Sequence, residues 1–464
     1  MVCKNKSDAL TRKGDKFFEK KLFFCYSELM ANFMKKLIPQ SMKNSYHLAQ
    51  AIFVNIWFGF PSRKIKVIGV TGTNGKTTTC QMIAKILEEA GKKTAMISTI
   101  NFKLGEKEWV NKTKFTTVSS FVTQKFIKEA VNENCEYLIL ETSSHSLDQY
   151  RVWGVDYDIA VITNITHEHL DYHKTMEEYR KAKLKLFKKA KTAVVNLDME
   201  RPEKFLNCGV ENAWGHSTKF LNQIKNPNLK FKKIIAEDIE SGMNYSKFKI
   251  QNSKFTLNLL GLFNIENALA AVCVGLSQDI SLEICAKALE KIKVVPGRMD
   301  EVENNLGVKI IIDYALTPDS MEKLGALILG LKNQKNKLIW VFGSCGERDR
   351  GKRPIMGEIA SRYADCIIIT NEDPYGEDPQ EIIDAVFDGV IKNKKLEENK
   401  NCWRIFDRHE AIAKALKLAR KGDIILVTGK GAEETMAIGD KRIDWNDKKV
   451  ILEELEKIKK SFLS

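Results

Sequence analysis

Short apolar runs rich in β-branched residues alternate along most of the chain with longer amphipathic stretches. Between Lys64 and Gly297 the clearest runs are 67–70, 94–98, 137–140, 159–163 and 193–196. Strands that alternate with helices in this way are typical of an α/β fold with a mainly parallel sheet. The pattern therefore predicts such a fold.

The alternation restarts after residues 296–298 and predicts a second α/β domain. The apolar runs of this part are 308–312, 338–342, 366–370 and 424–427. A chain of 464 residues is too long for one ordinary domain. We therefore predict a helical N-terminal segment (1–63), a central domain (64–297) and a C-terminal domain (298–464).

Residues 1–63 differ from the rest because they contain two long helix-compatible runs, 17–34 and 45–60. The apolar part of the second run, 51–60, is too short to span a bilayer. Basic residues flank it, so a helix lying on a membrane surface is one interpretation. A helix that covers the next domain is the interpretation that we favour.

Composition narrows the class of protein without choosing a partner. The net charge of +14, from 74 basic and 60 acidic residues, suits a nucleotide, a sugar phosphate, nucleic acid or an acidic membrane. Ten cysteines without a C-x-x-C pair indicate reduced thiols. The charged N-terminus lacks the apolar core of a signal peptide, so we expect a cytoplasmic protein.

The stretch 66–80 predicts a phosphate-binding loop between a strand and a helix. Gly72 and Gly75 let backbone N–H groups turn toward an anion, Lys76 can reach terminal phosphates and Thr77 can hold Mg²⁺. The usual first glycine of this motif is replaced by Val70, so the loop is a variant. The residues expected to hold a nucleotide are Gly72, Thr73, Asn74, Gly75, Lys76, Thr77 and Thr78.

Polar residues follow three of the predicted strands, where an open parallel sheet binds its ligands. Glu141 is placed as the acid that would hold Mg²⁺ opposite Thr77. Four histidines lie close together in sequence, but they lack a zinc-site spacing, so we do not predict zinc. Lys183, in the basic run 174–191, reads by composition as part of a solvated helix face. The loop 343–353 lacks Gly-Lys-Thr, and we interpret it as a charged surface loop.

Eight ordered motifs resemble those of the Mur ligases, and most closely those of the UDP-N-acetylmuramoyl-tripeptide synthetases. They are 72–77, 141–145, 163–173, 261–267, 295–299, 313–320, 351–354 and 429–431. Asp-Tyr-Ala-x-Thr-Pro-Asp-Ser at 313–320 is especially typical of that branch. The residues alone predict an Mg²⁺-nucleotide enzyme with an anionic substrate, and the resemblance makes this expectation specific.

The resemblance implies an ATP-dependent, amide-forming ligase that acts through an acyl phosphate. ATP would phosphorylate the terminal carboxylate of UDP-N-acetylmuramoyl-dipeptide, and a free amino acid would displace the phosphate. Lys76 would steady the phosphoryl group, and Thr77 with Glu141 would hold one Mg²⁺. His169 would support a second Mg²⁺, with Lys183 carbamylated by CO₂ to an anion. These expectations make Lys76, Glu141, His169 and Lys183 the catalytic set.

Further positions follow from the same resemblance. Asn264 and Asn267 would contact the adenine and ribose side of ATP, which Arg298 and Asp313 would position from the C-terminal domain. The expected contacts to the muramoyl-dipeptide are Thr116, Thr117, Ser143, Gln149 and Arg151. The expected positions around the incoming amino acid are Glu372, Asp373, Tyr375, Gly429 and Glu433.

The sequence departs from the family pattern at three places. Residues 1–63 stand where the family usually has a uridine-binding domain. Tyr375 replaces an arginine of diaminopimelate-adding members, which favours another amino acid, with lysine as a guess. Leu316 and Ala432 replace two histidines common in the family's C-terminal motifs.

Other functions stay open at this stage. The same chemistry could use another acceptor, as in folylpolyglutamate or cyanophycin synthesis. The chain could also be a non-catalytic nucleotide-binding partner, tethered by residues 1–63 to a membrane or a cell-wall assembly. Nucleic acid is the partner that charge alone would offer, and we do not expect it.

Overall fold

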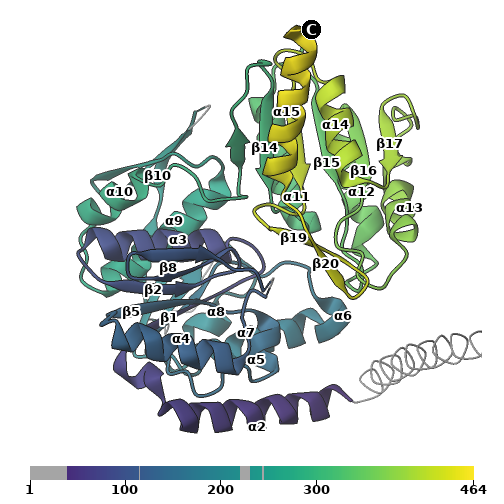
Figure 1. Cartoon of the computed structure of the whole chain (residues 1–464). Helices are drawn as coiled ribbons and strands as arrows, with labels where there is room; N and C mark the ends of the chain where they lie inside the picture. The colour runs from purple at the N-terminus through teal and green to yellow at the C-terminus, as the bar shows by residue number, and fades with distance from the viewer. Residues whose placement is uncertain (1–38, 114, 220–229, 243–244, 464) are drawn as a thin grey trace, which may run out of the picture.

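The structure is a computed structural model that describes residues 39–463 with gaps at 114, 220–229 and 243–244. Two α/β units, each built on its own sheet, lie next to each other (Figure 1). The helix expected at 17–34 falls outside the described residues. The boundary that we propose between residues 297 and 298 falls between the last helix of the first unit and the first strand of the second.

The first unit is organised by a nine-stranded sheet of order β4-β3-β2-β5-β1-β6-β7-β8-β9. From β2 to β9 in this order, neighbouring strands run parallel. At the other edge β3 pairs antiparallel with β2, and β4 pairs antiparallel with β3. The predicted α/β fold with a mainly parallel sheet is therefore confirmed. The strands are β1 (Lys66–Thr71), β2 (Thr94–Ile97), β3 (Asn101–Leu104), β4 (Lys107–Val110), β5 (Tyr137–Glu141), β6 (Ile159–Ile162), β7 (Thr192–Asn196), β8 (Asn212–Ser217) and β9 (Lys232–Ile235).

Helices cover both faces of this sheet because its central strands are apolar on both sides. In β1, Val67 packs into the core on one face and Ile68 into the core on the other. The first face carries α4 (Ser120–Asn132), α5 (Ser144–Asp148), α6 (Leu170–His173), α7 (Met176–Phe187) and α8 (Glu203–Leu206), and the second α3 (Lys76–Glu89), α9 (Leu262–Ser277) and α10 (Leu282–Glu290) (Figure 1). A small antiparallel sheet of β10 (Glu237–Ser241), β11 (Ser246–Ile250) and β12 (Ser253–Leu257) packs beside α10.

The second unit repeats this layered design around a six-stranded sheet of order β13-β14-β18-β15-β16-β17. Only β13 is antiparallel to its neighbour in this sheet. Its strands are β13 (Asp300–Val302), β14 (Lys309–Asp313), β15 (Leu338–Phe342), β16 (Cys366–Thr370), β17 (Cys402–Ile405) and β18 (Ile424–Thr428), followed by the hairpin β19 (Thr435–Ile438) and β20 (Lys441–Asp444). The helices α11 (Pro318–Leu331), α12 (Lys352–Tyr363) and α13 (Pro379–Val390) cover one face, and α14 (Arg408–Leu418) and α15 (Asp447–Leu463) the other.

A helix precedes the first sheet, as the run 45–60 predicts. It is α2 (Gln40–Phe58), followed by the short 3₁₀ turn η1 (Pro61–Lys64). α2 packs on α4 at the edge of the first unit (Figure 1), which agrees with a covering helix. In the described part of the chain, no helix has the length and apolar character that a membrane span requires.

One fully buried ion pair ties α14 to the start of α15. Arg408 donates from Nε and Nη2 to the two carboxylate oxygens of Asp447, at 2.8 and 2.7 Å, and neither side chain is exposed. Trp445 Nε1 also donates to Asp447, at 2.9 Å. Removing the charge of one partner would leave the other charge buried without compensation.

We therefore expect Asp447→Asn to lower the free energy of unfolding of the C-terminal unit by about 3 kcal/mol or more. Urea denaturation followed by tryptophan fluorescence measures this loss. The control is Asp156→Asn, which breaks the exposed Arg63–Asp156 pair and should cost less than about 1 kcal/mol. Equal losses in the two variants would contradict the assignment.

Candidate functional site

The glycines of the phosphate loop stand where no side chain fits. The loop leaves β1 at Gly72 and enters α3 after Gly75, and both glycines have positive φ, 151° and 81°. A Cβ atom on Gly72 would lie 1.9 Å from Thr163 Oγ1, and one on Gly75 would lie 2.2 Å from Asn267 Oδ1. The loop is therefore pressed against the end of β6 and the start of α9, which fixes its shape.

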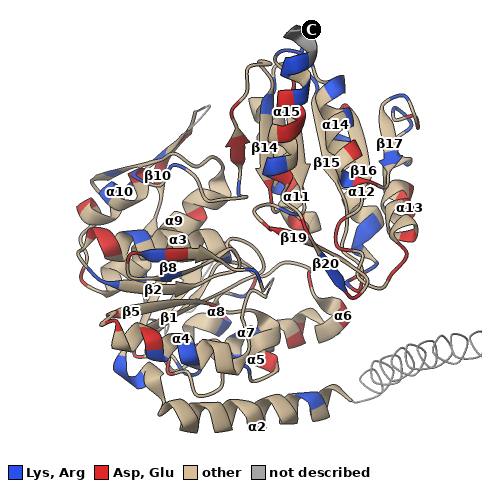
Figure 2. Cartoon of the chain, viewed as in Figure 1, with Lys and Arg blue, Asp and Glu red and all other residues tan. Residues whose placement is uncertain are grey.

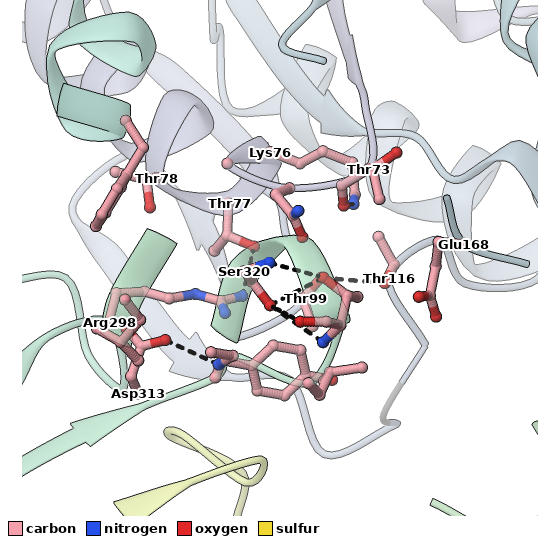
Figure 3. A pocket seen from close by; sticks show the side chains of 18 of the residues that line it. Thr73, Lys76, Thr77, Thr78, Thr99, Thr116, Glu168, Arg298, Asp313 and Ser320 are labelled. Carbon is pink, nitrogen blue, oxygen red and sulfur yellow. Dashed lines mark hydrogen bonds between the residues drawn. The ribbon is translucent and has the colours of Figure 1, made fainter. Parts of the chain in front are cut away.

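Lys76 and Thr77, the first residues of α3, face a cleft between the two units. Lys76 Nζ folds back to donate to the carbonyl oxygens of Gly72, at 3.1 Å, and Thr73, at 2.8 Å. Desolvation lowers the pKa of Lys76. In Figure 3 the Lys76 side chain runs along the loop toward Thr73, and the Thr77 side chain points to the middle of the pocket.

Glu141 ends β5, directly beside β1, and is buried. Its carboxylate accepts hydrogen bonds from Thr77 Oγ1 at 3.0 Å, from Thr99 N at 2.7 Å and from Thr99 Oγ1 at 2.8 Å. Carboxylate and hydroxyl oxygens are the ligands that Mg²⁺ prefers. Thr77 and Glu141 are thus brought together as predicted, and they fit a divalent cation.

The C-terminal unit forms the opposite wall of the cleft. Arg298 lies over the ring of Tyr314, with 4.3 Å from its guanidinium carbon to the ring centroid, and Nη2 is 3.5 Å from Thr77 Oγ1. Asp313 ends β14 and accepts from the backbone N–H groups of Met299 and Ala315, both at 2.8 Å. Desolvation raises the pKa of Asp313. Figure 3 shows Arg298 and Asp313 across the pocket from Thr78 and Thr77.

The cleft contains about 1590 Å³ of space between atoms, part of it open to solvent. Most of the predicted nucleotide-binding residues line it: Thr73, Asn74, Gly75, Lys76, Thr77, Thr78, Asn264, Asn267, Arg298 and Asp313. Asn264 and Asn267 come from the first turns of α9, where Asn267 Nδ2 donates to Asn264 Oδ1 at 3.3 Å. Gly72 lies behind the loop rather than on the wall of the cleft.

The predicted second metal position is next to the phosphate loop. His169 lines the cleft, and its ring centroid is 4.7 Å from that of His145. Burial lowers the pKa of His169 well below its usual value, so the imidazole is neutral and able to bind a metal. Among the described residues, no group of three or more His, Cys, Asp or Glu side chains could hold a metal ion.

The interpretation of Lys183 as part of a solvated helix face was wrong. It lies on α7 but is almost completely buried, and Nζ donates to Gly72 O at 2.9 Å. The same nitrogen is 4.4 Å from the ring centroid of Tyr179. Burial lowers the pKa of Lys183 well below its usual value, which makes the neutral amine easier to reach than in an exposed lysine.

The residues expected to contact the muramoyl-dipeptide form a group beside Glu141. Thr117 Oγ1 donates to Glu141 O at 3.0 Å and accepts from Ser143 N at 2.9 Å, and Arg151 Nη1 donates to Thr117 O at 2.6 Å. Thr116 lines the main cleft itself, where its hydroxyl is 3.1 Å from that of Thr99. Gln149 caps the C-terminus of α5, away from the cleft wall.

The residues expected around the incoming amino acid are divided in two. Asp373, Tyr375 and Glu433 line the cleft. Glu372 and Gly429 lie behind the wall, and a Cβ on Gly429 would meet Glu372 Oε2 at 1.9 Å. Burial raises the pKa of Glu372. Glu372 is therefore placed to support this wall rather than to touch a ligand.

A buried lysine organises this part of the cleft. Lys430 Nζ donates to Asp373 Oδ2 at 2.7 Å and also pairs with Glu433. Tyr314 OH donates to the other Glu433 oxygen at 3.0 Å. The two carboxylates therefore face the cleft already linked to a cation that water does not reach.

The loop 343–353 takes part in the site, so its interpretation as a surface loop was wrong. Lys352 is buried and pairs with Glu168 of the first unit at 3.2 Å. Arg348 lines the cleft with its side chain exposed, in the same part of the pocket as Tyr375. The sequence offered two signals, the density of basic residues in this loop and the family-like motif at 351–354, but its partners are distant in sequence.

A second contact between the units was also missed by sequence reasoning. Asn74 Nδ2 in the phosphate loop donates to Asp319 Oδ2 at the start of α11, at 2.9 Å. Asp319 in turn pairs with Lys323 at 3.3 Å. The nucleotide loop is therefore held directly by the C-terminal unit.

Comparisons with known proteins agree with this geometry. A family model described as the Mur ligase middle domain matches residues 70–275, and one described as the Mur ligase, glutamate ligase domain matches residues 297–431. The chain is 39% identical over 413 residues to the UDP-N-acetylmuramoyl-L-alanyl-D-glutamate–2,6-diaminopimelate ligase of Clostridium botulinum, over 88% of this chain and 82% of that protein. It is 35% identical to the UDP-N-acetylmuramyl-tripeptide synthetase of a Roseiflexus strain, over 88% of this chain and 82% of that protein.

Solved structures show the same fold. A UDP-N-acetylmuramoyl-L-alanyl-D-glutamate–2,6-diaminopimelate ligase matches with a TM-score of 0.55 and 29% identity, over 85% of this chain and 79% of that one. The folylpolyglutamate synthase of Mycobacterium tuberculosis matches with a TM-score of 0.65 but 14% identity, over 82% and 92% of the two chains, so it shows the fold alone. Because relatives well above 30% identity align over most of both chains, and both family models match in order, the chain belongs to the Mur ligase family.

Proposed function

We propose that the chain is an ATP-dependent ligase that adds an amino acid to UDP-N-acetylmuramoyl-dipeptide in peptidoglycan precursor synthesis. The observation that carries this proposal is that a nucleotide-type phosphate loop and a second group of polar residues line the same cleft. The phosphate loop with Thr77 and Glu141 forms one end, and Asp373, Tyr375 and Glu433 form the other. The curated relatives with the same two domains are named for this type of reaction.

The first step is the transfer of the γ-phosphoryl group of ATP to a substrate carboxylate. A carboxylate oxygen attacks the γ-phosphorus, ADP leaves and an acyl phosphate forms. Lys76 and the backbone N–H groups of the phosphate loop stabilise the charge on the phosphoryl oxygens. Thr77 and Glu141 would hold the Mg²⁺ that Mur ligases use, and the ion would supply positive charge to the phosphates.

The second step forms the amide bond. The neutral α-amine of the amino acid attacks the acyl carbon and gives up a proton, and phosphate leaves with the oxygen that came from the carboxylate. Arg298, aimed at Thr77 from the C-terminal unit, adds a positive charge at this end of the cleft. Because both units supply residues, their approach completes the site and excludes water.

Lys183 is proposed to act as a carbamate. Carbamylation requires an unprotonated amine: the nitrogen attacks CO₂, a C–N bond forms and a proton is released. Burial of Lys183 favours that neutral form. The resulting anion would lie beside Gly72 O and the phosphate loop, and it would join His169 in supporting a second Mg²⁺.

The acceptor peptide is proposed to lie beside Glu141. Thr116 lines the cleft, and Thr117 joins Ser143 and Arg151 to the backbone of Glu141 next to it. A carboxylate held there would be close to the transferring phosphoryl group. Gln149 is kept as a proposed contact at the outer edge of this group.

The amino acid is proposed to be cationic in its side chain rather than diaminopimelate. Arg348 is the cation beside Tyr375 in the described part of the cleft, and one guanidinium binds one carboxylate bidentately. The α-carboxylate of the amino acid would bind the Arg348 guanidinium. Tyr375 offers no positive charge to the side-chain carboxylate of diaminopimelate. Asp373 and Glu433 line the cleft and share Lys430, so these three groups together carry a net negative charge that suits a side-chain ammonium.

The central test is phosphate release from ATP by the purified chain. Release should require UDP-N-acetylmuramoyl-dipeptide and an amino acid together. Glu141→Gln removes the carboxylate charge that contacts Thr77 and should lower kcat by about 10²-fold or more. Glu106→Gln, an exposed control, should keep full activity. Release by the unchanged protein that does not depend on the dipeptide would contradict the proposal.

The carbamate can be observed directly by nuclear magnetic resonance in ¹³C-labelled bicarbonate. We expect a carbamate carbon signal in the unchanged protein and its loss in Lys183→Gln. Lys181→Gln, on the exposed face of the same helix, is the matched control and should keep the signal. An unchanged protein that is active without any such signal would show that Lys183 works as a plain amine.

Amino-acid choice is tested by comparing kcat/KM for lysine and for meso-diaminopimelate. We expect lysine to be preferred by at least about tenfold, because a second carboxylate would lose a charged partner. Tyr375→Arg should shift the preference toward diaminopimelate, and Tyr375→Phe should leave it unchanged. A preference of the unchanged protein for diaminopimelate, for which several relatives are named, would refute this assignment.

A further inference from the structure

The most exposed large apolar side chains of the described residues all lie on α2. They are Met42 (62% exposed), Tyr46 (66%), Phe53 (63%), Ile56 (64%) and Trp57 (71%). Spacings of three, four and seven residues place them along one face of the helix. α2 therefore presents a continuous apolar stripe to its surroundings.

The orientation of this stripe is fixed by the opposite face of α2. Ala51, Val54 and Asn55 are buried, and Asn55 Nδ2 donates to Trp153 O at 2.7 Å. A Cβ on Gly154 would meet the Asn55 side chain at 2.5 Å, so the fit there is close. The helix cannot roll its apolar side inward without breaking these contacts.

The segment that carries the stripe has a positive net charge. Residues 39–64 include Lys43, Arg63 and Lys64 and contain no Asp or Glu. Residues 1–64 hold twelve Lys and Arg against four Asp and Glu, so they carry +8 of the net charge of +14. Figure 2 shows α2 almost free of charged residues apart from one basic position.

We propose that α2 docks on an anionic membrane surface through this stripe. An interfacial helix buries Trp, Phe and other apolar side chains at the headgroup level while nearby Lys and Arg attract anionic lipid. A second copy of the chain is a poorer partner, because it would bring two positive segments together. This inference does not depend on the proposed reaction.

The position of α2 lets the docked protein keep working. α2 lies on the side of the first unit that faces away from the C-terminal unit (Figure 1). No residue of α2 lines the cleft. A protein held through α2 therefore leaves its cleft open to soluble ligands.

Vesicle flotation of the full chain tests the proposal. Binding is expected to vesicles of phosphatidylcholine mixed with phosphatidylglycerol, to be weaker with phosphatidylcholine alone, and to fall as salt is added. The variant Phe53→Ser with Trp57→Ser should bind at least about tenfold more weakly, because two large apolar anchors are lost. Phe406→Ser, which removes a 53% exposed phenylalanine from the C-terminal unit, is the matched control and should bind as before.

The fold and the oligomeric state of the double variant are measured in parallel. The double variant should keep the circular dichroism spectrum and the thermal unfolding midpoint of the unchanged protein, which shows that it is folded whether or not the proposed reaction is correct. Absence of binding to phosphatidylglycerol vesicles would overturn the proposal, as would equal binding by the double variant. A dimer that the double variant converts to a monomer in light scattering would also overturn it, since the stripe would then be a subunit interface.

Discussion

The contact between the Thr77 hydroxyl and the Glu141 carboxylate is the constraint on which the site depends. It joins the first turn of α3 to the end of β5, and Val70 of β1 is paired with Glu141 in the sheet. Parallel strands place their carboxyl ends at one edge, so the loop after β1 and the acid after β5 have to meet. The close approach of Gly72 to Thr163 then fixes the loop from the other side.

The C-terminal unit completes this arrangement through a small number of contacts. Lys352 reaches Glu168, next to His169, and Asn74 reaches Asp319. Burial raises the pKa of Glu168, which shows what it costs to take this carboxylate out of water. A buried ion pair is weak evidence for stability but strongly favours one geometry, so this pair defines how the two units meet.

Local sequence signals predicted the sheets and the phosphate end of the cleft, because strand periodicity and glycine spacing act over a few residues. They misjudged Lys183, whose neighbours on α7 are basic and exposed, because only the packing of α7 beneath Gly72 buries it. They also misjudged the loop 343–353, since Lys352 and Glu168 are far apart in the chain and meet only when both sheets have formed. The proposed role of Lys183 comes from the resemblance to a family, and the burial of its side chain, which lowers its pKa, is consistent with that proposal.

The most direct test of the central claim follows the oxygen atoms of the acceptor carboxylate. UDP-N-acetylmuramoyl-dipeptide labelled with ¹⁸O in that carboxylate is incubated with the protein, ATP and the amino acid, and the released phosphate is examined by mass spectrometry. An acyl phosphate at the Lys76 end of the cleft predicts phosphate that carries a single ¹⁸O from the carboxylate. Phosphate that contains only unlabelled oxygen would contradict the account.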